Sequence, residues 1–93
     1  MIHVNLYATF RLAAGVKTIE LDLPGSSSIF SAVLRITERY PMLRRHWLDQ
    51  AGELHAHVHI FCNGEDVTVT PAGLQTELQP GDTLDFFPPV AGG

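Results

Sequence analysis

The residues most suited to take part in a chemical reaction are the last eight, residues 86–93. They are Phe-Phe-Pro-Pro-Val-Ala-Gly-Gly. A terminal carboxylate is a poor electrophile until it is activated, for example by adenylation. A glycine acyl group then offers the least hindrance to attack by sulfur or by an amine. Gly92 and Gly93 have no Cβ, so the carboxylate of Gly93 can enter a passage too narrow for other residues. The sequence therefore predicts that the reactive group is the C terminus itself.

The two prolines predict a stiff connection between this end and the folded body. Pro88 and Pro89 each hold φ near about −65° and push the preceding residue towards an extended conformation. Val90 and Ala91 are small, and residues 89–93 span about 15 Å at roughly 3.3 Å per extended residue. We therefore expect a folded domain over residues 1–88 and a flexible, extended tail over residues 89–93. A frayed, inert terminus is the alternative.

The pattern Phe-Phe-Pro-Pro-Val-x-Gly-Gly closely resembles the end of the small subunit of molybdopterin synthase, a ubiquitin-like sulfur carrier. The resemblance implies that an E1-like adenylyltransferase activates Gly93 with ATP and that a sulfur donor protein converts it to a thiocarboxylate. The large subunit of molybdopterin synthase would then receive the tail and pass the sulfur to the pterin precursor of the molybdenum or tungsten cofactor. No permanently bound cofactor is implied.

Three other interpretations stay open at this point, because a terminal Gly-Gly alone is shared by many ubiquitin-like proteins. The carrier could deliver sulfur to another pathway, such as thiamine or cysteine synthesis. It could be a protein modifier joined to lysines through Gly93. It could also be a plain interaction module with an inert tail.

Composition narrows the class of protein and partner. Ninety-three residues suit one domain. The net charge is −4, and Arg44-Arg45 is the only adjacent basic pair, which argues against nucleic acid and favours basic protein partners. The sequence has no apolar run of membrane-spanning length and no signal-peptide pattern, so we expect a cytoplasmic protein without membrane contact.

Hydrophobic periodicity predicts an alternation of strands with one main helix. Apolar and polar residues alternate strictly over residues 2–10, and again over 18–23, which predicts a hairpin around a loop at 11–16. Ser26-Ser27-Ser28 supplies capping oxygens before a helical stripe that Pro41 ends. The pattern over residues 41–54 predicts a short second helix that Gly52 ends. By the resemblance stated above, this segment is an insertion, and the sequence assigns it no role.

The second half of the chain predicts three further strands. Residues 55–62 alternate, Asn63-Gly64 is a strong two-residue turn signal, and residues 65–69 return as a short strand. An irregular stretch with Leu74 and Leu78 as core residues leads to a last strand at 83–87. This order is that of the α+β β-grasp fold, a mixed sheet of four to five strands packed on one main helix. The resemblance implies that the first and last strands are parallel neighbours.

Strand parity points to a partner-binding surface beside the tail. Phe61, Phe87 and Tyr7 fall on outward positions of strands that the β-grasp order makes neighbours, and exposed aromatic groups commonly mark docking surfaces. The alternative is that residues 41–54 fold over them. Arg11 follows the first strand, so we expect it at the same end of the sheet as Pro88, where it could contact a partner.

No side-chain catalysis is predicted. His55, His57 and His59 share one face of an expected strand, but alternate residues lie about 6.5 to 7 Å apart and no obvious carboxylate or cysteine completes a metal site. Cys62 is the only cysteine, and its neighbours make it a small core residue rather than a sulfur relay. No serine or cysteine is paired with a base, and no glycine-rich phosphate loop is present.

Overall fold

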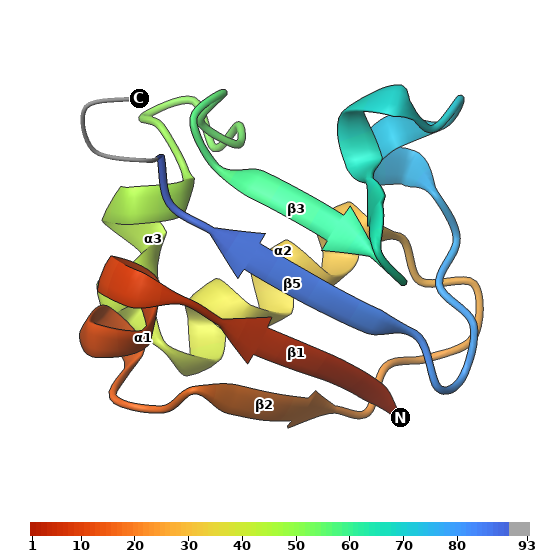
Figure 1. Cartoon of the computed structure of the whole chain (residues 1–93), viewed down its shortest axis with the longest axis horizontal. Coiled ribbons are helices and arrows are strands. Elements are labelled where there is room, and N and C mark those ends of the chain that lie inside the picture. The colour runs from red at the N-terminus through yellow and green to blue at the C-terminus, as the bar shows by residue number, and fades with distance from the viewer. Residues whose placement is uncertain (90–93) are drawn as a thin grey trace.

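The computed structural model describes residues 1–89. Val90, Ala91, Gly92 and Gly93 lie outside the described residues, so what the sequence predicts for them stays a prediction. Five strands form one sheet in the order β2-β1-β5-β3-β4 (Figure 1). The strands are β1 (Ile2–Leu6), β2 (Thr18–Leu21), β3 (His59–Cys62), β4 (Glu65–Asp66) and β5 (Thr83–Phe87).

The centre of the sheet is the parallel pair of β1 and β5, in register from His3 with Thr83 to Leu6 with Phe86. β2 flanks β1 and β3 flanks β5, both antiparallel. This confirms that the first and last strands are parallel neighbours, as the resemblance implies. Because the two strands are parallel, their C-terminal ends lie at the same end of the sheet (Figure 1).

One face of the sheet is buried under α2 (Ile29–Arg39), which crosses behind it in Figure 1. The Ser28 hydroxyl oxygen accepts the Ser31 backbone N–H at 3.1 Å and caps the helix, as the serine run predicts. Inward residues from alternate strand positions pack with the helix in one core. They include Val4, Leu6, Ile19, Leu84, Phe86, Val33 and Ile36.

The first predicted strand is too long. β1 ends at Leu6, and α1 (Ala8–Ala14) follows, so the expected loop at 11–16 is largely helical as well. Phe10 is buried because the helix carries it towards Trp47, with ring centroids 5.6 Å apart, rather than because of strand parity. Gly15 ends the helix at φ +79°, a left-handed conformation that suits glycine.

Two later strands are also shorter than predicted. Residues 55–58 form a turn, closed by the Val58 N–H donating to the His55 carbonyl, and β3 begins only at His59. β4 is two residues long, because Asp66 accepts the Thr68 N–H and starts the 3₁₀ turn η1 (Val67–Val69). A second such turn, η2 (Gly73–Gln75), follows. The Asn63-Gly64 turn is confirmed, with φ +52° and +84°.

The segment after Pro41 is part of the core. Pro41 is the first residue of α3 (Pro41–Trp47), where its missing N–H has no helical partner to lose. Trp47 is fully buried and stacks on Phe86 at 4.2 Å. The helix ends at Trp47 rather than at Gly52, which lies in a later turn at φ +82°. Within residues 1–89, no helix is long and apolar enough to cross a membrane.

Replacing Trp47 tests whether α3 belongs to the core. We expect Trp47→Ala to lower the free energy of unfolding by about 3–5 kcal/mol, because it opens a large cavity against Phe86. Trp47→Phe should cost less, since it keeps a ring there and removes an indole N–H that has no partner among the described residues.

Urea denaturation followed by circular dichroism measures these changes. Met42→Ala on the exposed side of the same helix is the matched control and should stay within about 0.5 kcal/mol of the parent. Equal effects of Trp47→Ala and Met42→Ala would show that α3 is only an appended segment.

Candidate functional site

Three aromatic side chains from three strand ends meet on the outer face of the sheet. Tyr7 and Phe87 stack with centroids 4.2 Å apart and planes 11° apart. Phe61 meets Phe87 edge-on at 5.6 Å. All three are half-buried. The structure thus brings together the residues that strand parity selected, and we call Tyr7, Phe61 and Phe87 the aromatic patch.

A carboxylate lies among these rings. Oδ1 of Asp85 accepts hydrogen bonds from Asn5 Nδ2 at 2.9 Å and from the Tyr7 hydroxyl at 3.2 Å. Burial is the main reason that the pKa of Tyr7 is raised, and the negative Asp85 raises it further, while Arg11 opposes the shift. The Tyr7 hydroxyl therefore stays protonated near neutral pH and donates to Asp85, which fixes the ring beside Phe87.

Sequence reasoning missed Asp85. Its position was readable, because it alternates with the inward Leu84 and Phe86 and so faces outward with Phe87. Its role could not be predicted, because its hydrogen-bond partners are Asn5 of β1 and Tyr7, which follows β1, and both are far away in the sequence.

One depression, with a volume of about 640 Å³, lies away from the aromatic patch. A second depression, with a volume of about 590 Å³, lies at the aromatic patch. The second is lined by Phe61, Phe87, Asp85, His59, Gly64 and Pro88. Pro88 is the last residue before the tail, so this depression adjoins the point from which the tail begins. We therefore take it, rather than the larger one, as the candidate site.

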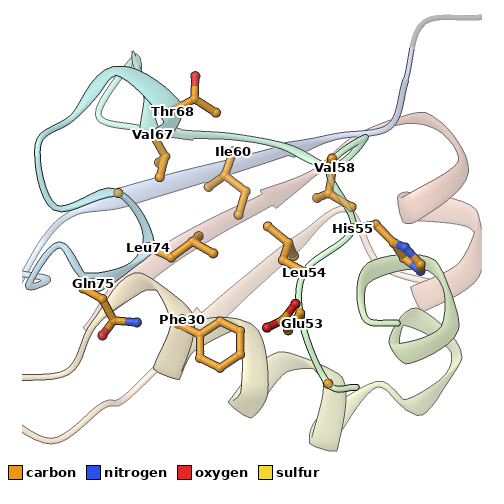
Figure 2. Close-up of a pocket in the computed structure, with 13 residues that line it drawn as sticks. Phe30, Glu53, Leu54, His55, Val58, Ile60, Val67, Thr68, Leu74 and Gln75 are labelled. Atoms are coloured by element: carbon orange, nitrogen blue, oxygen red, sulfur yellow. The ribbon is translucent and has the colours of Figure 1, made fainter. Parts of the chain in front are cut away.

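The larger groove lies between α2, β3 and the two 3₁₀ turns. Figure 2 shows Phe30, Leu54, Ile60 and Leu74 converging on it. Its lining includes no residue of β5 or of the tail root, and its ionisable side chains are Glu53 and His55. Among the described residues, no cysteine, serine or lysine lines this groove.

Residues 41–54 do not cover the aromatic patch in the described structure. Leu43, Trp47 and Leu48 are buried in the core, where Trp47 stacks on Phe86. Phe86 and Phe87 are consecutive in β5 and face opposite sides of the sheet. The alternative in which this segment folds over the aromatic patch is therefore wrong.

Arg11 lies near the tail root, although on helix α1 rather than in a loop. Its Nε donates to the Leu6 carbonyl at 3.4 Å, and Leu6 is paired with Phe86. Its side chain is exposed, and it does not line the depression. A role for Arg11, as for the aromatic patch, in binding a partner stays a prediction.

The three histidines do not share a strand face. His55 and His57 precede β3 and stack on each other at 4.8 Å, and only His59 lies in the strand. Among residues 1–89, no cluster of three or more histidine, cysteine or carboxylate side chains could hold a metal ion.

Cys62 lies on the inner side of β3, half-buried against the core, as predicted. Burial raises the pKa of its thiol, and the carboxylates of Asp82 and Glu65 raise it further. The thiolate is the nucleophilic form, so this environment opposes a sulfur relay at Cys62.

The mixed sheet wrapped on α2, with β1 and β5 parallel at its centre and a Gly-Gly terminus in the sequence, defines a ubiquitin-like β-grasp protein. The chain belongs to the ThiS family, whose profile matches residues 4–93. It is a family of ubiquitin-like sulfur carriers and modifiers.

Individual relatives carry different names. Small archaeal modifier protein 1 of Haloferax volcanii is 32% identical over 89 residues, covering 96% of this chain and 97% of its own. Its crystal structure matches with a TM-score of 0.89 at 30% identity, over 99% and 98% of the two chains.

Two further relatives are named for sulfur carriage and for molybdopterin. Sulfur carrier protein CysO of Mycobacterium tuberculosis is 45% identical over 42 residues, 45% of this chain and 44% of its own. A structure from Pyrococcus furiosus, described as molybdopterin converting factor subunit 1, has a TM-score of 0.75 at 28% identity, over 96% and 97% of the chains.

The reactivity of Cys62 tests its structural role. Because the raised pKa leaves less thiolate at pH 8, we expect iodoacetamide to alkylate the folded protein several-fold more slowly than the same protein in urea. Intact mass against time gives both rates, and glutathione in the same buffers corrects for any effect of urea on the reagent. Equal rates in the folded and unfolded protein would indicate an accessible, reactive thiol instead.

Proposed function

We propose that this chain is the sulfur-carrying small subunit of molybdopterin synthase. The observation that carries the proposal is the Phe-Phe-Pro-Pro-Val-x-Gly-Gly terminus placed directly on the central strand β5. The likeness to the Pyrococcus furiosus protein described as molybdopterin converting factor subunit 1 supports it.

The sheet gives the tail a rigid origin. β5 is paired on both sides, by β1 and by β3, so the strand that ends at Phe87 cannot fray at one edge. Pro88 and Pro89 then restrict the backbone, so little chain entropy is lost when a partner binds the tail. A partner that contacts the aromatic patch can therefore receive the terminal glycines at a defined distance from its own surface.

The chemistry resides in Gly93. Its carboxylate attacks the α-phosphorus of ATP on an activating enzyme, which forms an acyl-adenylate and releases pyrophosphate. Hydrosulfide supplied by a sulfur donor attacks the acyl carbon, and AMP leaves, so that a thiocarboxylate remains. On the large subunit that sulfur replaces an oxygen substituent on a carbon of the pterin precursor, so a C–O bond breaks as the C–S bond forms. Water then cleaves the acyl–sulfur bond, which restores the Gly93 carboxylate and leaves the sulfur on the pterin.

The folded domain contributes binding rather than catalysis. Its net charge of −4 favours encounter with basic partner surfaces, and the aromatic patch supplies apolar contact area beside the tail. We place these ATP-dependent reactions in the cytoplasm.

A second candidate function is protein modification. One relative that matches over nearly the whole chain is named small archaeal modifier protein 1. The same acyl-adenylate, attacked by a lysine amine in place of hydrosulfide, would give an isopeptide bond and AMP.

One reaction series separates the candidates. The protein is incubated with an E1-like adenylyltransferase, ATP and sulfide, and its intact mass is measured. The large subunit and the precursor pterin are then added. We expect one oxygen to be replaced by sulfur and this sulfur to be consumed as molybdopterin forms.

The other results of that series contradict the proposal in distinct ways. Thiocarboxylate without turnover indicates another sulfur acceptor. Adducts on lysines indicate a modifier. The absence of any ATP-dependent mass change indicates an interaction module with an inert tail.

Extending the chain tests the role of the terminal carboxylate. One alanine added after Gly93 should abolish thiocarboxylate formation, because the new terminal residue displaces the glycine acyl group from its place. The melting temperature should stay that of the parent. One alanine added before Met1 is the matched control and should retain activity, while activity in the C-terminally extended protein would refute the mechanism.

A further inference from the structure

The depression at the aromatic patch contains the carboxylate of Asp85, which can accept more hydrogen bonds than it does. Both hydrogen bonds to Asp85 reach the same oxygen, Oδ1, and Oδ2 accepts none from residues 1–89. Among residues 1–89, the one ion pair within 4 Å joins His3 to Glu20, on the other side of β1. A carboxylate among aromatic rings therefore has no cationic partner within the described part of the chain.

The sheet register defines what surrounds this carboxylate. Phe61 lies directly opposite Asp85 on β3, and Asn5 lies opposite it on β1. Phe87 follows two residues along the same face of β5, which is the middle strand of the sheet (Figure 1). Phe61 thus stands on one side of the carboxylate and Asn5 on the other. Tyr7, which also donates to the carboxylate, stacks on Phe87.

We propose that this depression receives an arginine side chain of the protein that binds the tail. A guanidinium can donate to the free oxygen of Asp85 while its flat face lies against Phe61 or Phe87. The overall charge of −4 is complementary to such a partner. The identity of that partner rests on the proposed function, and the chemistry of the depression does not.

Other occupants fit the depression less well. An apolar side chain would exclude water from Asp85 without giving its free oxygen a donor, which is costly for a charged group. A lysine offers a compact, strongly hydrated charge and has no flat surface to stack on an aromatic ring. Asp85 therefore selects among partners, since a protein with an apolar side chain at the matching position is rejected.

The proposal can be tested with a small probe and no partner protein. The ¹⁵N-labelled full chain is titrated with N-acetyl-arginine amide at pH 8, and amide shifts are followed by NMR. We expect shifts at Phe61, Asp85 and Phe87, and an affinity about tenfold lower in Asp85→Asn, which keeps an acceptor oxygen for Tyr7 but loses the charge.

Two controls make that titration specific. Glu20→Gln removes a charge from the same face of the sheet, on β2, and should leave the affinity of the arginine probe unchanged. N-acetyl-leucine amide tests simple apolar binding and should shift these residues less than the arginine probe does. Absence of arginine-induced shifts, equal affinity in Asp85→Asn, or equal shifts with the leucine probe would overturn the proposal.

A second experiment places the depression in the reaction. With the E1-like enzyme, ATP and sulfide, Asp85→Asn should raise KM for this chain about tenfold with kcat unchanged. The melting temperature should match that of the parent. An unchanged KM would show that the activating enzyme does not use Asp85. If the parent chain itself is not activated, the proposed function fails, whereas the arginine titration still decides what the depression binds.

Discussion

The structure depends on the parallel pairing of β1 with β5 at the centre of the sheet. This pairing puts the first and last strands side by side, so residues more than seventy positions apart form one surface. It sets Asn5 against Asp85 and brings Tyr7 beside Phe87. It also holds the residue before Pro88 in a strand that is bonded on both edges, so the origin of the tail is fixed by the most constrained part of the fold.

The side chains of β5 alternate between the core, where they stabilise the fold, and the outer face, where we propose that a partner binds. Leu84 and Phe86 face the core, where Phe86 stacks on Trp47, while Asp85 and Phe87 face outward. Because consecutive residues serve opposite faces, the outer positions can vary with the partner at little cost to the core. The same backbone carries both sets of side chains, so the surface that we propose for the partner is fixed to a strand paired on both sides.

Much of this arrangement was predictable from local patterns. Strict alternation at residues 83–87 predicts the two faces of β5. The serine before Ile29 predicts the cap of α2, and Asn63-Gly64 predicts the turn. The failures occur where alternation is ambiguous. Residues 8–10 continue the alternating pattern of β1 and yet begin helix α1, whose first turn has no capping side chain to signal it. The stacking of Trp47 on Phe86 and the setting of Asp85 depend on contacts between distant segments, which periodicity does not report. The chemistry at Gly93 rests on sequence alone, because the described structure ends at residue 89.

We propose that the domain exists to present a sulfur-bearing glycine acyl group at its own end. The most direct measurement is the mass spectrum of the C-terminal peptide, isolated under non-reducing conditions from native cells that cannot make the pterin precursor. Because the acceptor is missing, the account predicts that a thiocarboxylate accumulates on Gly93. An unmodified Gly93 carboxylate in those cells, or sulfur found on Cys62 instead, would contradict it.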